Sequence, residues 1–219
     1  MSQNYPQVEM TAVYGLFHYI FKTLYGMLFR GDVTGVENIP AHGAFLLAGN
    51  HASHLDPPAI GSNVPRQISF FARKTLWKGG VLSWWMNQAG CIPVDRDGAS
   101  DVSAIKRVLK TLQNGKALIL FPEGTRSRDG SFQKPKSGVG MIACRARVPV
   151  VPVRIFDSHK AWGRSGRFTP STPVSITYGK PLQLVDIEDK SAGKARYQIA
   201  SERIMAAIAA LERPPVTII

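Results

Sequence analysis

The chain has 219 residues, of which 44% are hydrophobic and 19% are charged. This balance is typical of one globular domain with a sizeable core, and no internal repeat or low-complexity tract points to a solenoid or a disordered chain. Lys and Arg total 27 against 15 Asp and Glu, a formal net charge of +12, which favours anionic partners: a phospholipid surface, a phosphorylated substrate, an acidic carrier protein or nucleic acid. Two cysteines make no disulfide framework and no cleavable signal peptide is evident, so we expect a reducing, cytosolic compartment.

Residues 1–30 are dominated by an apolar stretch that approaches the length of a membrane span. Small and polar residues recur every three or four positions and draw a narrow stripe along one side of a helix: Gly15, His18, Lys22 and Gly26. We interpret this segment as an amphipathic helix in the membrane interface, with Tyr14, Tyr19 and Tyr25 at the headgroup level. A helix packed on the domain's own core and a true membrane span are the alternatives.

The apolar run at residues 44–49 predicts a buried strand that ends in a polar turn, and Pro57-Pro58 after that turn predicts a helix with Asp56 as its N-cap. His51 and Asp56 can meet only because the residues between them lie outside the helix. Asp56 would then accept a hydrogen bond from one imidazole nitrogen and leave the other to take a proton from a hydroxyl. For these residues alone, a simple helix cap or a metal site that includes His54 remains possible.

Two further strands and a helix are predicted between residues 67 and 114. Residues 67–72 form the first strand, followed by Arg73 and Lys74, and residues 90–96 form the second, which ends in Asp95-Arg96. The tryptophan-rich segment at residues 77–86 is favoured as core over a surface that touches lipid. Residues 100–114 have helical spacing.

A second polar loop follows the buried strand predicted at residues 116–121. It reads Pro122-Glu123-Gly124-Thr125-Arg126-Ser127-Arg128-Asp129-Gly130. Because open α/β sheets bind ligands beyond the carboxyl ends of their strands, we expect this loop to lie beside the His51 turn. Arg126 suits a phosphate, Glu123 can hold that guanidinium or accept a substrate hydroxyl, and Gly124 lets backbone approach the ligand. A merely solvated charged loop is the alternative.

The rest of the chain predicts a helix at residues 138–147, a strand at 148–155, an alternating strand at 173–179 and a closing amphipathic helix at 195–211. Two prolines in the strand at 148–155 predict irregular or edge pairing. The closing helix should turn four residues inward: Ile199, Ile204, Ile208 and Leu211. Strands alternating with helices predict an α/β fold, a single domain with a mostly parallel central sheet flanked by helices.

Taken together, these motifs resemble the PlsC-like glycerolipid acyltransferase family, the lysophosphatidic acid (1-acyl-sn-glycerol-3-phosphate) acyltransferases. The resemblance covers about residues 33–182. The four blocks of the family occur in family order: Asn50 to Asp56 for the His-x-x-x-x-Asp block, Gly90 to Arg96, Phe121 to Ser127, and the proline-containing Val148 to Val153. The resemblance divides the chain into a membrane-associating helix, residues 1–30, and an acyltransferase domain, residues 31–219.

The resemblance also implies roles for single residues. His51 would be the base that deprotonates the acceptor hydroxyl, and Asp56 its partner. Residues from three regions would hold the glycerol phosphate: Arg73 or Lys74, Arg96, Glu123, Gly124, Thr125 and Arg126. Many members have Ala-Lys where Ala72 is followed here by Arg73 and then Lys74, so which of the two faces the phosphate is open.

The activity implied is transfer of a fatty acyl group from acyl-CoA or acyl carrier protein to the free hydroxyl of 1-acyl-sn-glycerol-3-phosphate, forming phosphatidic acid. It requires no metal, no covalent acyl-enzyme and no cofactor beyond the co-substrate, and backbone amides near Gly138 are candidate oxyanion donors. The same chemistry on another lipid acceptor, or a non-catalytic basic module on a membrane, are the alternatives. Nucleic acid is not expected, because aromatic residues do not interleave with Lys and Arg. The implied location is the cytoplasmic side of a membrane, peripheral or monotopic, with a single span left open.

Overall fold

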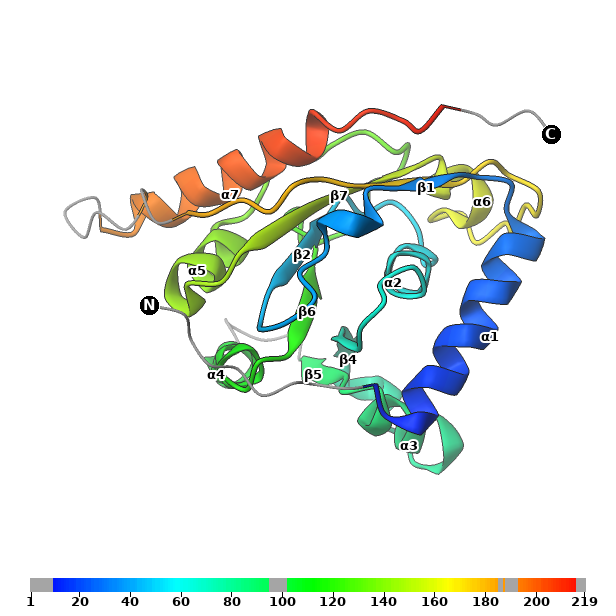
Figure 1. Ribbon diagram of the computed structural model, residues 1–219, viewed down its shortest axis with the longest axis horizontal. Helices are drawn as coiled ribbons and strands as arrows, with labels where there is room; N and C mark the ends of the chain where they lie inside the picture. The colour runs from blue at the N-terminus through cyan, green and yellow to red at the C-terminus, as the bar shows by residue number, and fades with distance from the viewer. Residues whose placement is uncertain (1–9, 95–101, 185–186, 188–192, 216–219) are drawn as a thin grey trace.

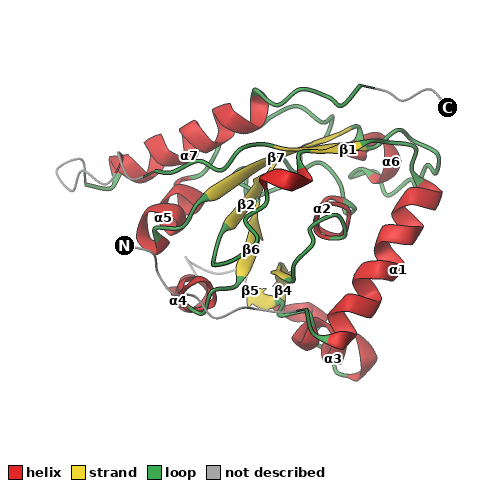
Figure 2. Ribbon diagram, viewed as in Figure 1, coloured by secondary structure: helices red, strands yellow, loops and turns green. Residues whose placement is uncertain are grey.

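The computed structural model describes residues 10–94, 102–184, 187 and 193–215 (Figure 1). A six-stranded sheet lies at its centre, and every neighbouring pair of its strands is parallel except β7 and β8. From edge to edge the strands are β1 (Val33–Thr34), β8 (Ser175–Tyr178), β7 (Val150–Phe156), β2 (Leu46–Gly49), β6 (Ala117–Leu120) and β3 (Ile68–Ser69). Helices flank this sheet (Figure 2), so the predicted α/β fold with a mostly parallel sheet is confirmed.

The helices divide between the two faces of the sheet. One face packs against α4 (Val102–Gln113), α5 (Ser137–Ala146) and α7 (Ala195–Ala209). The other packs against α2 (Asp56–Gly61) and the inner side of α1 (Ala12–Leu28). The shorter helices are α3 (Gly80–Gln88), α6 (Ser158–Trp162) and the 3₁₀ turns η1 (Val36–Asn38) and η2 (Lys74–Leu76).

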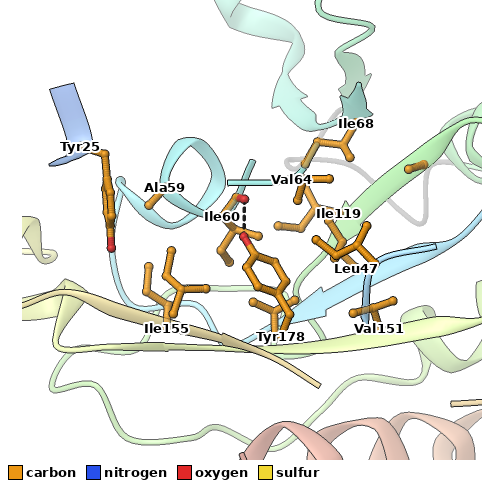
Figure 3. Close-up of a cluster of buried hydrophobic side chains, with 14 of the residues drawn as sticks. Tyr25, Leu47, Ala59, Ile60, Val64, Ile68, Ile119, Val151, Ile155 and Tyr178 are labelled. Atoms are coloured by element: carbon orange, nitrogen blue, oxygen red, sulfur yellow. Dashed lines mark hydrogen bonds between the residues drawn. The ribbon is translucent and has the colours of Figure 1, made fainter. Parts of the chain in front are cut away.

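Alternation along the buried strands gives each face its own core. On the β2 segment, Leu46 and Ala48 join the core under α5 and α7, whereas Leu47 joins the core under α2. Continuous apolar strands of this kind are expected where helices cover both faces of a parallel sheet. Figure 3 shows the core under α2, where the hydroxyl of the buried Tyr178 donates a hydrogen bond of 2.6 Å to the Ile60 carbonyl.

The strand predicted at residues 67–72 is two strands that belong to different sheets. β3 pairs with β6, whereas β4 (Phe71–Arg73) leaves the main sheet and pairs in parallel with β5 (Ile92–Val94). The chain changes partner at Phe70, whose carbonyl accepts a 2.7 Å hydrogen bond from the Ile92 N–H. The predicted end of the second strand, Asp95-Arg96, lies outside the described residues.

The prolines predicted irregular or edge pairing for residues 148–155; the edge position is wrong, because β7 lies between β2 and β8. Pro149 precedes the strand, so only Pro152 has to be accommodated. The Pro152 carbonyl faces the β8 side, where it accepts the Gly179 N–H at 2.8 Å. Proline has no N–H to donate toward β8 on that side. The regular pairing of β7 with β8 therefore begins one residue later, at Val153.

Helix α1 is packed on the domain along one side. Tyr14 and Tyr25 are buried, the Tyr14 hydroxyl accepts the Ile68 N–H, and the Tyr25 hydroxyl donates to the Val174 carbonyl. The prediction that all three tyrosines lie at a lipid headgroup level is therefore wrong for these two, while Tyr19 is 70% exposed. Within the described residues, no helix has the length and hydropathy needed to cross a bilayer.

Two other burial predictions are corrected by the structure. In α3, Val81 is 78% and Trp84 50% exposed, while Met86 is buried, so this segment is mainly surface and not core. In α7, Ile204 and Ile208 are buried as predicted, but Ile199 is 52% exposed. Ile199 precedes Ile204 by five positions, which on a helix turns its side chain well away from the buried face.

Two helices on one face of the sheet, α5 and α7, approach closely at a glycine. A Cβ atom at Gly140 would overlap the Tyr197 carbonyl oxygen and lie 2.8 Å from Ser201 Oγ. The Gly140 N–H donates to that same Ser201 Oγ at 2.9 Å. By contrast, a Cβ at Gly138, also in α5, would meet nothing within 4 Å.

Candidate active site

The polar turn after β2 brings His51 and Asp56 into contact. Asp56 is fully buried, and its Oδ2 lies 2.8 Å from His51 Nδ1 and accepts the backbone N–H groups of Ala52 and Ser53 at 2.7 Å each. With Nδ1 engaged, the His51 ring keeps Nε2 for another partner. Asn50 ties the turn to β7, because its side chain exchanges two hydrogen bonds with the backbone of Ile155.

The prediction that Asp56 is the N-cap of α2 is wrong. The helix begins at Asp56 itself, Leu55 occupies the cap position, and a proline stands in the first turn. The carboxylate points back into the turn, where it binds two backbone N–H groups that would otherwise be unpaired beside His51.

The loop after β6 binds the backbone of His51 on both sides. Glu123 Oε1 accepts the His51 N–H at 3.0 Å, and the Ser127 N–H donates to the His51 carbonyl at 2.7 Å. Glu123 is only 2% exposed. Burial raises the pKa of Glu123 to about 7, the backbone N–H groups of His51 and Gln133 act against this rise, and the charge of Asp56 adds to it.

The His51 ring forms part of the wall of a cavity of about 330 Å³. The ring stacks on Phe121, with centroids 4.1 Å apart and planes 17° apart. Gly124 and Lys136 supply the polar part of the wall near it, and most of the rest is apolar: Phe71, Val94, Val139 and Ile142. Gly124 has φ +69°, and a Cβ there would lie 3.1 Å from the Lys136 side chain. Glycine adopts this positive φ without strain, which allows the loop to turn at this position.

A second cavity of about 360 Å³ lies next to the first, and the two share Pro57 and Phe70 in their walls. Its lining comes largely from apolar residues of α1, α2 and α3, such as Phe17, Phe21 and Trp85. The two cavities therefore run from the His51 turn toward the side of the molecule that carries α1 and α3 (Figure 1).

Arg126 and Thr125 continue the loop beyond Gly124. Thr125 is exposed and Arg126 is half-buried. Burial lowers the pKa of His54, the nearby guanidinium of Arg126 lowers it further, and the charge of Asp56 acts against both, so Arg126 lies near the His51 turn. The two predicted polar loops are therefore on the same side of the molecule.

The other predicted phosphate-binding residues lie at the second sheet. Arg73 is the last residue of β4 and Lys74 begins the turn η2, and both are exposed. Arg73 pairs in register with Val94, which lines the His51 cavity. Arg96 lies outside the described residues, so its predicted role stays a prediction.

Three neighbours of His51 were not predicted as part of the site: Phe121, Ser127 and Lys136. Phe121 precedes the polar loop in sequence, Ser127 lies within it, and Lys136 follows it. In the described part of the chain, no three His, Cys, Asp or Glu side chains converge to hold a metal ion.

Comparisons with known proteins agree with one another. Residues 30–156 match the family described as Acyltransferase. The 1-acyl-sn-glycerol-3-phosphate acyltransferase alpha of Homo sapiens is 33% identical over 150 residues, 67% of this chain and 52% of that protein. The chloroplastic enzyme BAT2 of Brassica napus, also named a 1-acyl-sn-glycerol-3-phosphate acyltransferase, is 30% identical over 66% of this chain and 44% of its own length. The chain thus spans about half the length of the curated relatives it matches.

A solved structure is similar over more of the chain. It is the crystal structure of the 1-acyl-sn-glycerophosphate (LPA) acyltransferase PlsC from Thermotoga maritima. The TM-score is 0.66 at 26% sequence identity, and the similarity covers 90% of this chain and 79% of that one.

Proposed function

Because the chain belongs to the Acyltransferase family, whose profile matches residues 30–156, we propose that it transfers a fatty acyl group to the free hydroxyl of 1-acyl-sn-glycerol-3-phosphate. The product is phosphatidic acid, and the donor is a thioester, acyl-CoA or acyl carrier protein. The observation that carries this proposal is the 2.8 Å contact between His51 Nδ1 and the buried Asp56, with the ring at the wall of a mainly apolar cavity. The acceptor named in the similar proteins is the same lysophospholipid.

The chemistry follows from this arrangement. Asp56 holds the proton on Nδ1, so Nε2 has a lone pair that accepts the proton of the acceptor hydroxyl. The hydroxyl oxygen attacks the thioester carbon, the C–S bond breaks, and the proton on Nε2 passes to the departing thiolate. Phe121, stacked at 4.1 Å, stabilises the imidazolium formed between these two proton transfers.

The negative charge that develops on the thioester oxygen needs hydrogen-bond donors. The first turn of α5 has no side-chain cap, and Gly138 in that turn lines the same cavity as His51. The backbone N–H groups near Gly138 are the proposed donors. No metal or other cofactor takes part, and Arg126 with Arg73 or Lys74 holds the phosphate of the acceptor.

We place the protein at the cytoplasmic side of a membrane, bound at its surface. The outward side of α1 is apolar, with Leu16 60% and Met27 77% exposed. α3 continues this surface, since Trp85 packs on Phe17 and Phe21 of α1 and Val81 is exposed. An exposed apolar surface that extends over two helices, on a chain of net charge +12, suits an anionic bilayer.

The test is release of thiol from acyl-CoA with and without lysophosphatidic acid. We expect release that depends on the acceptor, and His51→Ala should lower turnover about 10²- to 10⁴-fold without unfolding the protein. The same assay with acyl carrier protein and with other lysolipids identifies the donor and the acceptor. Near-normal turnover by a folded His51→Ala variant would refute the role of His51.

A further inference from the structure

Glu123 differs from its neighbours in where its side chain lies. Pro122 and Gly124 both line the cavity that holds His51, but Glu123 is not among the described residues that line it. Its side chain is buried, with only 2% of the residue exposed, and Oε2 is inaccessible to solvent. A group in this position has no open path to a substrate in the cavity.

Besides the backbone N–H of Gln133, Glu123 contacts the turn that carries His51. Oε1 accepts the His51 N–H at 3.0 Å across 72 positions of sequence. Together with the Ser127 N–H on the His51 carbonyl, it binds both peptide groups of one residue. The Asp56 carboxylate fixes the ring of that residue from a third direction.

These contacts bear on the direction of the His51 ring. The hydrogen bond that His51 Nδ1 donates to Asp56 fixes the rotation of the imidazole, but the Cα–Cβ bond from which the ring extends is set by the backbone. A shift of about 1 Å in a catalytic group is enough to cost about 100-fold in rate. Without an acceptor at Glu123, the part-buried His51 N–H would be unpaired and the turn would relax to find another partner.

We propose that Glu123 is a positioning residue, which holds the backbone of His51 so that its ring faces the acceptor hydroxyl, and that it does not bind the glycerol phosphate. This inference rests on the acyl transfer proposed above. It replaces the substrate contact that the family resemblance implied for Glu123. The function needed at this position is a hydrogen-bond acceptor, which a neutral amide also supplies.

The experiment compares Glu123→Gln, Glu123→Ala and Arg126→Ala by steady-state kinetics with lysophosphatidic acid varied. Glu123→Gln keeps a carbonyl oxygen for the His51 N–H and should stay within about fivefold of wild type in kcat. Glu123→Ala should lower kcat about 100-fold with the KM for lysophosphatidic acid changed less than about twofold. Arg126→Ala should instead raise that KM by about tenfold or more. Glu202→Ala, an exposed glutamate of α7, is the matched control and should match wild type.

A rise of tenfold in the KM of either Glu123 variant would overturn the inference, because it is the sign of a lost substrate contact. Equal loss of kcat in Glu123→Gln and Glu123→Ala would overturn it too, because the charge would then matter and not the acceptor. If Glu123→Ala does not fold, Glu123→Gln decides alone: a kcat within about fivefold of wild type with an unchanged KM supports the inference, and a kcat about 100-fold lower or a KM about tenfold higher overturns it. Absence of acceptor-dependent thiol release in the wild-type protein would instead refute the proposed function, whatever the variants do.

Discussion

One oxygen of Asp56 binds both the His51 side chain and the backbone of the His51 turn. Oδ2 accepts His51 Nδ1 and the N–H groups of Ala52 and Ser53, all within 2.8 Å. The ring cannot turn away without loosening the same carboxylate that orders the turn. A single buried carboxylate thereby fixes both the tautomer of the imidazole and the loop that carries it.

The raised pKa of Glu123 makes a prediction about stability. Burial raises this pKa from the ordinary 4.5 to about 7, so between these values the folded protein holds a proton that the unfolded chain has released. The free energy of unfolding therefore falls, through this group, as the pH rises from 4.5 to 7, by at most about 1.4 kcal/mol per pH unit. Glu123→Gln lacks the titration, so its stability relative to wild type should increase over this range.

The measurement is urea unfolding of both proteins at several pH values between 4.5 and 8. His18 and His54 have lowered pKa values, chiefly through burial, so they act in the opposite direction and stabilise the folded state as the pH rises through their range. Both proteins contain them, and the difference between the two curves removes their effect. Parallel curves for wild type and Glu123→Gln would contradict the raised pKa.

The pair of His51 and Asp56 was predictable because it is local: five positions and a proline-started helix nearly determine that contact. The role of Glu123 was not. Its partner is a backbone N–H 72 positions away, and a sequence shows no backbone donors. A glutamate three positions before an arginine suited to phosphate was therefore interpreted as a substrate ligand, although its burial points to the backbone.

At the scale of the elements, the boundaries of the longer predicted helices agree closely with the structure, whereas their buried faces were predicted only in part. Tyr14 and Tyr25 are eleven positions apart, about three turns, so they share one face and are buried together. Tyr19, five positions after Tyr14, points away to solvent. Strand partners were beyond prediction for a different reason: nothing in residues 67–72 marks the change from the main sheet to the second one.

The packing of α5 on α7 predicts unequal effects for two glycines of one helix. Gly140→Ala puts a methyl group into the Tyr197 carbonyl, and overpacking of this kind costs about 1–3 kcal/mol. Gly138→Ala meets nothing within 4 Å and improves helix propensity by about 0.5–1 kcal/mol. Thermal unfolding should show a melting temperature lowered by about 3–10 °C for Gly140→Ala and unchanged or raised for Gly138→Ala. Equal melting temperatures would mean that α7 moves aside without cost.

At the scale of the whole molecule, the apolar side formed by α1 and α3 and the cavities behind it give the protein an orientation. The second cavity is lined from α1 and α3, and the first contains His51. In the proposed orientation a lipid would enter from the bilayer without crossing water. The cationic residues of the polar loops would then meet its phosphate at the far end.

This orientation predicts how the protein binds vesicles. Changing both Leu16 and Met27 to Glu removes two exposed apolar side chains from α1 and adds two negative charges, so binding to vesicles that contain phosphatidylglycerol should weaken at least about tenfold. Ile199→Glu, at an equally apolar and 52% exposed position of α7, is the control and should bind as wild type does. Vesicle sedimentation measures both, and loss of binding in the control alone would put the membrane surface on α7.

The position of β2 between β7 and β6 has a consequence for how new chains are made. Leu46 pairs with Leu118 and with Val150. The two neighbours of β2, the strand before the His51 turn, are therefore synthesised 72 and 104 residues after it. At typical synthesis rates of 5–20 residues per second, the second neighbour emerges from the ribosome about 5–20 s after β2. During that interval a fully apolar segment has both edges open, and nascent chains shorter than about residue 156 should be the ones that depend most on chaperones.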